Sequence, residues 1–456
     1  MSENTTSSGI ITELGTSEHG TGTGGHVHAA TMKPIDGGKD QPSWELLSTC
    51  VHCGLCLNHC PTYKTLGMEM DSPRGRIYQV LQVNEGAMDF NASFTEHIDR
   101  CLGCLACEIA CPSGVKYGRI VERARAQIER NAHRPFFNRF LRNLFYRHII
   151  SNFKVLKIVA TLMRFYQRSG LQTLVRKSGL LKLMGMAEVE SLSPQIDSKF
   201  FFDQIGTVHA AVGEKRGKVA FLAGCINNVA FSHLNNATLR VLTQNGFEVH
   251  VPAGQGCCGA LHAHAGYRDE ARALARHNIR IFLAGNYDAV VTNAAGCGSN
   301  LKEYDDLLED DAEYIGRAKE FVAKAKDVTE FLAGKGLLQP KRKIGKRVAY
   351  QDACHLGNAQ RIRTQPRELL TAIGCVLVEI PHPDQCCGSA GVYNVAQTDL
   401  SMKILAAKMD DVQSVTSDMI ATANVGCMIQ LRAGMQQRGM NQPIKHVVEL
   451  LDEAFS

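Results

Sequence analysis

Eight cysteines in two short runs are the residues of this sequence best suited to chemistry. The runs C-V-H-C-G-L-C-L-N-H-C-P (Cys50–Pro61) and C-L-G-C-L-A-C-E-I-A-C-P (Cys101–Pro112) both fit the spacing C-x2-C-x2-C-x3-C-P. Thiolate is the soft ligand that iron–sulfur clusters select, and in chains with two such runs the fourth cysteine of each ligates the other cluster. The sequence therefore predicts two [4Fe–4S] clusters, one held by Cys50, Cys53, Cys56 and Cys111 and the other by Cys60, Cys101, Cys104 and Cys107. Zinc is the alternative, but zinc sites usually combine well-separated C-x2-C pairs.

A second set of cysteines lies in an internal repeat of the C-terminal half. V-A-F-L-A-G-C (Val219–Cys225) corresponds to V-A-Y-Q-D-A-C (Val348–Cys354), and each is followed by a C-C-G tripeptide and then by one more cysteine. Such self-similarity indicates one structural unit used twice. The candidate ligands are Cys225, Cys257, Cys258 and Cys297 in the first copy and Cys354, Cys386, Cys387 and Cys427 in the second. Four thiolates could hold a further [4Fe–4S] cluster or a zinc ion, act as a redox-active dithiol, or remain empty structural thiols.

These repeats resemble the cysteine-rich (C-C-G) domain of heterodisulfide reductase-like proteins. In the fuller motif of that family another cysteine follows the last one as C-x-x-C, where this sequence has Asn300 and Gln430. The resemblance therefore does not extend to a non-cubane cluster, because the expected fifth ligand is missing. Cys375 has no counterpart in the first copy and is predicted to be a small buried apolar residue.

The cysteines of each repeat need a scaffold that brings distant positions together. Apolar runs such as V-A-F-L, F-E-V-H-V and D-A-V-V-T lie between helical stretches, which predicts parallel α/β units. Open α/β sheets place their sites at strand ends, so the cysteines are expected on one rim of each sheet. The predicted fold class is a multidomain α+β and α/β protein, with a helical dicluster ferredoxin-like module followed by tandem α/β CCG repeats.

Composition divides the chain into five segments. Residues 1–42 are rich in Gly, Ser and Thr and are predicted to be a disordered tail. The other predicted segments are the dicluster module at 43–130, a basic helical linker at 131–205, the first CCG repeat at 206–335 and the second at 336–456. The tail contains G-T-G-T-G-G (Gly20–Gly25), but no strand precedes this string and no helix follows it. We therefore expect no flavin or NAD in this chain.

The linker carries a one-sided charge pattern. From Arg130 to Lys182 there are twelve Lys and Arg residues and no Asp or Glu. Aromatic and aliphatic residues are interleaved with these cations, as in F-F-N-R-F-L-R-N-L-F-Y-R. Such a segment could pack on the core with a solvated basic face, dock an acidic partner subunit, or lie on an anionic membrane surface.

Net charge, cysteine content and the distribution of apolar residues limit the functions and locations that the sequence is compatible with. The chain has 456 residues and a formal net charge of +5, a mildly basic balance that does not indicate nucleic acid binding. The N-terminus has no features of a secretion signal, so the seventeen cysteines indicate a reducing compartment and a cytoplasmic location is expected. No apolar run approaches 18 residues, so any contact with the inner face of the cell membrane would be peripheral.

The order of these segments, together with the strings C-P-T-Y, D-S-P-R-G-R-I-Y, C-P-S-G-V, C-C-G-S-A-G and T-A-N-V-G-C, closely resembles the iron–sulfur subunit of bacterial glycolate oxidase (glycolate dehydrogenase). The resemblance covers about residues 43–456. It implies a partner with FAD that oxidises glycolate to glyoxylate, and a role for this chain in passing electrons one at a time toward a membrane quinone. It also implies that this chain has no catalytic residues of its own.

Two other functions remain open at this point. The chain could be the iron–sulfur subunit of a related complex that oxidises lactate or glycerol 3-phosphate. It could also be a self-contained heterodisulfide-reductase-like enzyme that acts on disulfides through the CCG thiols. A purely structural role of the repeats in assembly is a third interpretation of that half of the chain.

Overall fold

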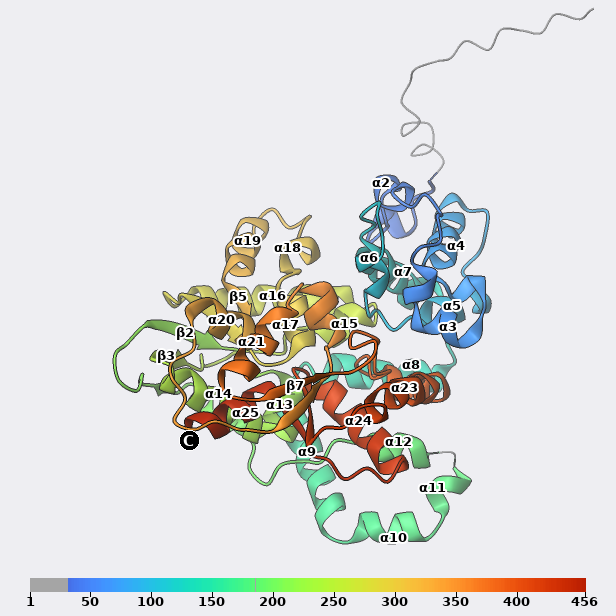
Figure 1. The fold of residues 1–456 in the computed structure, drawn as a ribbon. Helices are drawn as coiled ribbons and strands as arrows, with labels where there is room; N and C mark the ends of the chain where they lie inside the picture. The colour runs from blue at the N-terminus through green and yellow to red at the C-terminus, as the bar shows by residue number, and fades with distance from the viewer. Residues whose placement is uncertain (1–31, 185) are drawn as a thin grey trace, which may run out of the picture.

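The computed structural model describes residues 32–184 and 186–456, and its N-terminal part is a bundle of short helices drawn in blue in Figure 1. This bundle contains all eight cysteines of the two runs. Its helices are α2 (Trp44–Ser48), α3 (Pro61–Leu66), α4 (Pro73–Glu85), α5 (Ala92–Asp99), α6 (Ala106–Ile109) and α7 (Tyr117–Asn131), with the 3-10 turns η2 (Leu57–His59) and η3 (Glu69–Asp71).

Local sequence explains why α4 begins inside the string D-S-P-R-G-R-I-Y. The Ser72 hydroxyl caps the helix by accepting a hydrogen bond from the Gly75 N–H at 3.0 Å. Pro73 takes the first helical position, where its missing N–H has no intrahelical partner to lose. Gly86 ends the helix with a φ of 73°, a left-handed conformation that glycine adopts without strain. The buried face of α4 packs on α7 between the two cysteine runs.

The structure corrects the C-terminal end of the predicted disordered tail. Residues 1–31 lie outside the described residues, but residues 32–42, which include η1 (Asp36–Gly38), pack on the body of the protein. The Lys33 N–H donates to the Asn84 carbonyl at 2.8 Å, and the Asp40 side chain is fully buried among arginines. A polar composition does not predict this packing, because the segment is held by one buried charge whose partners come from distant parts of the chain.

The basic linker is helical, as predicted, and runs from the module to the first sheet. Its elements are α8 (Phe136–Asn143), the π-helix η4 (Leu144–Ile149), α9 (Phe153–Arg168), α10 (Leu171–Lys177), α11 (Leu180–Leu183), α12 (Ala187–Ser191) and the 3-10 helix η5 (Phe201–Gln204). Leu156 and Ala160 of α9 are buried in the main core. Within the described part of the chain, no helix is both long and apolar enough to span a bilayer.

The C-terminal half forms two sheets with the same internal strand order. The first contains β1 (Val208–His209), β2 (Gly217–Phe221), β3 (Phe247–His250), β4 (Ala289–Thr292) and β5 (Ala325–Asp327) in the order β1-β3-β2-β4-β5. The second contains β6 (Arg347–Tyr350), β7 (Val376–Glu379), β8 (Met419–Thr422) and β9 (Ile444–His446) in the order β7-β6-β8-β9. All neighbouring strands are parallel except β1 and β3. The predicted parallel sheets are therefore confirmed, whereas β1 and the last strand of each repeat were not predicted.

Each of the two repeats also packs its last helix against the other repeat. The first repeat has α13 (Cys225–Ala230), α14 (Ser232–Gln244), α15 (Ala260–His264), α16 (Arg268–Leu283), α17 (Ala295–Leu301), α18 (Tyr304–Leu307), α19 (Ile315–Lys324) and α20 (Val328–Lys335). The second has the π-helix η6 (His355–Ala359), α21 (Thr364–Ala372), α22 (Tyr393–Ala396), α23 (Thr398–Gln413), α24 (Val425–Gln437) and α25 (Val447–Phe455). The last helix of each repeat packs on the first long helix of the other, α20 on α21 and α25 on α14. Both repeats consequently share one hydrophobic core.

Candidate metal centres

The four cysteines predicted to hold one cluster line a single cavity in the N-terminal module. Cys50, Cys53 and Cys56 lie in the loop after α2, and Cys111 follows α6. The loop reverses at His52 and Gly54, whose φ angles of 53° and 85° are left-handed. Cys53 is exposed to solvent, whereas the other three are partly buried.

The other four cysteines line a second cavity, and all of them are buried. Cys60 comes from the first run, while its companions Cys101, Cys104 and Cys107 come from the second. The first cavity shows the converse: three of its predicted ligands come from the first run, and the second run contributes Cys111. Pro73, Cys107 and Tyr117 line both cavities, so the two sites are adjacent.

The cysteine side chains that line the two cavities provide thiolates, the soft ligands that [4Fe–4S] clusters select. A zinc ion requires four ligands around one point. The separate irons of a cubane cluster instead let thiolates approach from different sides. The distribution of the eight ligands between two clusters remains a prediction, and the two cavities support it.

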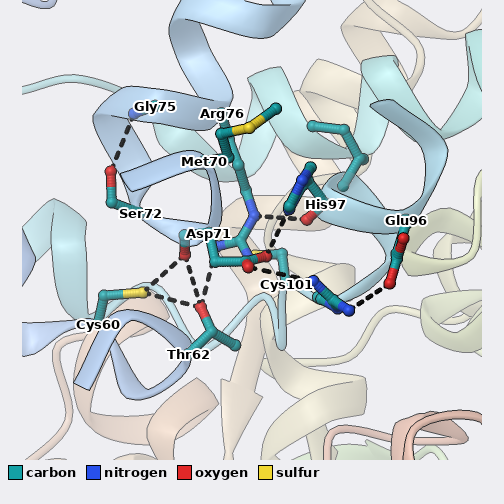
Figure 2. A network of polar contacts seen from close by, with 12 residues as sticks. Cys60, Thr62, Met70, Asp71, Ser72, Gly75, Arg76, Glu96, His97 and Cys101 are labelled. Atoms are coloured by element: carbon teal, nitrogen blue, oxygen red, sulfur yellow. Dashed lines mark hydrogen bonds and ion pairs between the residues drawn. The ribbon is translucent and has the colours of Figure 1, made fainter. Parts of the chain in front are cut away.

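A buried polar network lies beside the second cavity, and its largest fully buried side chain is Arg76 (Figure 2). The guanidinium donates to the His97 carbonyl at 2.7 Å, to the Thr62 hydroxyl at 3.1 Å and to the Asp71 carboxylate at 3.2 Å. The Thr62 oxygen lies 3.1 Å from the Cys60 sulfur. A buried guanidinium needs such partners, because an unpaired buried charge is costly. The network therefore fixes the chain around Cys60.

Arg76 also sets the electrostatics of Cys101. Burial by itself would raise the pKa of this thiol, but the charges of Arg76 and Arg125 bring it below the ordinary value. The Tyr117 hydroxyl and the Gly103 N–H also reach the Cys101 sulfur, at 3.5 Å and 3.3 Å. Arg76 and Tyr117 were not predicted as site residues. The only sequence signal for Arg76 was its place in D-S-P-R-G-R-I-Y.

In the first repeat the four candidate cysteines converge in an environment that provides no cation. Cys225 starts α13, Cys257 and Cys258 precede α15, and Cys297 lies in α17. The Cys257 and Cys225 sulfurs are 3.6 Å apart, and those of Cys258 and Cys297 are 3.1 Å apart. The hydrogen bond to Cys257 and burial raise the pKa of Cys225 well above its usual value. The pKa of Cys258 is also raised well above its usual value: the hydrogen bond from Cys257 lowers it, but the one to Cys297 and burial outweigh it.

In the second repeat the equivalent cysteines lie beside two basic side chains. Cys354 precedes η6, and its sulfur is 3.4 Å from the His355 Nδ1. The hydrogen bond from Cys386, together with His355, lowers the pKa of Cys354 to about 5 despite burial. Hydrogen bonds from Cys386 and Cys427, with the charge of the buried Lys408, hold the pKa of Cys387 well below its usual value. Hydrogen bonds to Cys354 and Cys387, with burial, raise the pKa of Cys386 well above its usual value, and the hydrogen bond to Cys387, with burial, does the same for the pKa of Cys427. Two of the four thiols of this site, Cys354 and Cys387, are therefore biased toward the thiolate form.

The two positions that depart from the fuller CCG motif are buried and hydrogen-bonded. The Asn300 amide donates to the Cys258 carbonyl at 2.7 Å. The Gln430 amide donates to the Ser401 hydroxyl at 2.9 Å and accepts from Asn394 at 3.1 Å. Both side chains therefore support the structure around the C-C-G turns through these hydrogen bonds. Cys375 is buried, as predicted, at 6% exposure.

The cysteine sites follow one another through the molecule. Cys104 of the second cavity shares a buried apolar cluster with Cys386 and Tyr393 of the second repeat. The Asn358 amide donates to the Cys104 carbonyl at 2.9 Å, which joins the same two parts. In turn α17, which carries Cys297, packs on η6 next to Cys354. The order is thus first cavity, second cavity, second repeat, first repeat.

Comparison with known proteins identifies relatives of each part. Three family models match, described as a 4Fe-4S dicluster domain (residues 46–115), the linker region of the glycolate oxidase iron-sulfur subunit (137–193) and a cysteine-rich domain (219–302 and 348–432). A probable glycolate oxidase iron-sulfur subunit of Bacillus subtilis is 39% identical over 90% of this chain and 94% of its own length. The glycolate oxidase iron-sulfur subunit of Escherichia coli is 31% identical over the same shares. Lactate utilization protein A of a Geobacillus species is 28% identical over 52% of this chain and 99% of its own length.

Proposed function

The chain belongs to the family of glycolate oxidase iron–sulfur subunits, and from this premise we propose that it relays electrons from a flavoprotein partner toward a membrane quinone. The partner would carry FAD and oxidise glycolate to glyoxylate. This chain would contribute neither a flavin site nor a catalytic residue. Relatives named for glycolate oxidase match nearly its whole length, whereas the lactate utilization relative matches about half, which favours glycolate as the substrate of the complex.

The observation that carries the proposal is the pair of adjacent cavities with exchanged cysteines. The predicted ligands at the first cavity are three cysteines of the first run and Cys111, with Cys107 also in the lining, and those at the second cavity are three cysteines of the second run and Cys60. When bound there, a [4Fe–4S] cluster accepts and donates one electron at a time. The exposed Cys53 places the first cavity next to the surface where a partner protein can approach. The buried second cavity adjoins the second repeat through the apolar cluster of Cys104 and Cys386.

We further propose that the second repeat holds an iron–sulfur cluster and that the first repeat does not. A cluster with four thiolate ligands has a negative net charge, and a buried charge must be compensated nearby. The second repeat supplies His355 and the buried Lys408, although Lys408 also lies 3.8 Å from the Asp411 carboxylate. The first repeat has Ile226 directly after Cys225 and Asn278 at the position of Lys408, each being the eleventh residue of its helix, α16 or α23. The first site is thus suited to protonated thiols.

The test is anaerobic purification of the complete complex, followed by addition of glycolate. We expect electron paramagnetic resonance signals of reduced clusters in this chain and about twelve irons per chain, which corresponds to three [4Fe–4S] clusters. Cys60→Ser and Cys111→Ser should each disturb a different cluster signal, although Cys60 lies in the first run and Cys111 in the second. An isolated chain that oxidises glycolate without any flavoprotein would contradict the relay. An iron content of about eight per chain would contradict the proposed cluster in the second repeat but would leave the proposed relay standing.

A further inference from the structure

The helices of the linker form an arm that extends away from both sheets, and its surface is unusually apolar. Figure 1 shows α9 to α12 as this arm at the bottom of the view. On α9 the side chains of Ile158, Leu162 and Phe165 are 62%, 65% and 67% exposed. Their spacing of four and three residues puts them on one face of the helix. Leu174 of α10 is 65% exposed and continues the apolar surface along the arm.

The cations of the linker differ in their partners. Near the module, Arg134 and Arg142 both reach Glu129 and Arg147 reaches Glu270, whereas Arg139 of α8 is exposed and has no ion pair with a described residue. On the arm, Lys157 pairs with Asp203 and Arg176 pairs with Glu190. Lys154, Arg168 and Lys177 of the arm are exposed and form no ion pair with any residue that the structure describes. These three unneutralised cations lie on the arm together with the exposed apolar side chains.

We propose that this arm binds the surface of an anionic lipid bilayer. Contiguous exposed apolar side chains mark an interaction surface. A helix with aromatic and aliphatic residues among cations matches the headgroup region of such a bilayer, where the apolar side chains enter the acyl boundary and the cations meet lipid phosphates. The exposed charges of the arm without an ion pair to a described residue are mostly positive, Lys154, Arg168 and Lys177 against Glu188 of α12, which fits a negatively charged surface. The inference deepens the proposed delivery of electrons to a membrane quinone and rests on that function for its purpose.

Vesicle sedimentation tests the arm without requiring electron transfer. The complete chain with its clusters is mixed with vesicles of phosphatidylglycerol or of phosphatidylcholine, at low and at high salt. We expect binding to phosphatidylglycerol at low salt, weaker binding at high salt and little binding to phosphatidylcholine. The variant Leu162→Ser/Phe165→Ser should reduce the partition coefficient at least about tenfold, because each lost side chain removes its transfer from water. The variant Lys154→Glu/Arg168→Glu should lose the preference for anionic lipid.

The control is Val208→Ser/Val212→Ser, which removes two apolar side chains that are 57% and 59% exposed beside the first sheet. This variant should bind vesicles like the unmodified chain. The proposal would be overturned if the control lost as much vesicle binding as the arm variants, or if the two arm variants lost none. If the arm variants bind vesicles normally but no longer assemble with the flavoprotein, the arm is a protein interface and the membrane proposal is wrong. Glycolate-dependent cluster reduction, measured separately, reports on the relay alone.

Discussion

The two CCG repeats share a strand order but differ in the charges around their cysteines. With the extra strand β1 left aside, the second strand of each repeat in sequence pairs with the first, and the third strand lies on the other side of the first. Within this common frame the second repeat has His355 and Lys408 where the first has Ile226 and Asn278. Charge, and not fold, distinguishes the two sites.

The repeats also differ in how they join the N-terminal module. Buried ion pairs join the first repeat to the N-terminal part of the chain. The Asp40 carboxylate accepts a hydrogen bond from Arg268 at 2.8 Å, and Arg123 donates one to Asp306 at 3.3 Å. The second repeat contacts the module around its cysteines, where the Tyr393 hydroxyl donates to the Arg100 carbonyl at 2.9 Å. The two copies of the duplicated unit therefore have different structural roles. One copy anchors the module, and the other lies beside its buried cysteine site.

Replacing one cysteine in each repeat should separate these tasks most strongly. Cys387→Ser removes a thiolate from the second site, and we expect loss of glycolate-dependent electron delivery to background and a fall from about twelve to about eight irons per chain. Cys258→Ser is the matched change in the first repeat and should leave iron content and electron delivery nearly unchanged. The measurements are iron analysis and quinone reduction by the purified complex. The reverse pattern, with Cys258→Ser the more damaging, would break the comparison.

The anchoring task predicts a large loss of stability from Asp40→Asn. Burial would raise the pKa of Asp40, but hydrogen bonds and charges from Arg272, Arg268 and Arg130 hold it well below the usual range. The ion pairs therefore stabilise the fold above the unfolded pKa and lose this effect only in acid. Removal of the carboxylate takes the nearest acidic partner from the buried Arg268, which keeps Glu122 at 3.3 Å and Asp306 at 3.9 Å. This change should cost up to about 3–5 kcal/mol in anaerobic urea unfolding.

The control for this prediction is Asp269→Asn. Asp269 pairs with Lys39 at 2.8 Å in the same region, but both side chains are half exposed. An exposed pair of this kind contributes less than about 1 kcal/mol. The cluster signals should be unchanged in both variants, because neither residue lines a cysteine cavity. If both variants lost a similarly small amount of unfolding free energy, the buried ion pairs would not be what anchors the module to the first repeat.

Part of this architecture could be predicted from sequence because its signals are local. Alternating apolar runs predicted the parallel sheets. The spacing within each cysteine run predicted two ligand sets, and these stay a prediction that the two cavities support. The predicted crossing of Cys60 and Cys111 between the clusters follows from the chemistry of two adjacent clusters.

The remainder depends on contacts between residues far apart in the chain. Nothing around Asp40 in the sequence indicates partners such as Arg268, and Lys408 stands in an ordinary helical stretch. The last strand of each repeat is only three residues long, too short to show a period. The packing of each last helix against the other repeat cannot be read from either repeat alone, because both copies have the same pattern.

A smaller difference between the repeats concerns the residue that ends the last strand and caps the following helix. Asp327 caps α20 by accepting from the Thr329 N–H at 2.8 Å, and His446 caps α25 by accepting from the Val448 N–H at 3.2 Å. Burial raises the pKa of Asp327 to about 6 and lowers the pKa of His446 to about 4. The contribution of Asp327 to stability is therefore complete below the unfolded pKa of 3.8 and is lost as the pH rises through 6. That of His446 is complete above 6.5 and is lost as the pH falls through 4.

The variant Asp327→Asn keeps the cap, since asparagine caps helices as well as aspartate, but it removes the buried charge. The difference between the unfolded pKa of 3.8 and the folded pKa of about 6 corresponds to about 3 kcal/mol. The variant should therefore be more stable than the unmodified chain by up to this amount at pH 8 and by about half of it at pH 5. The midpoint of anaerobic thermal unfolding at the two pH values measures this difference. His446→Gln should show the opposite trend, with any gain confined to acid. An equal gain for Asp327→Asn at both pH values would mean that packing, and not charge, distinguishes the two caps.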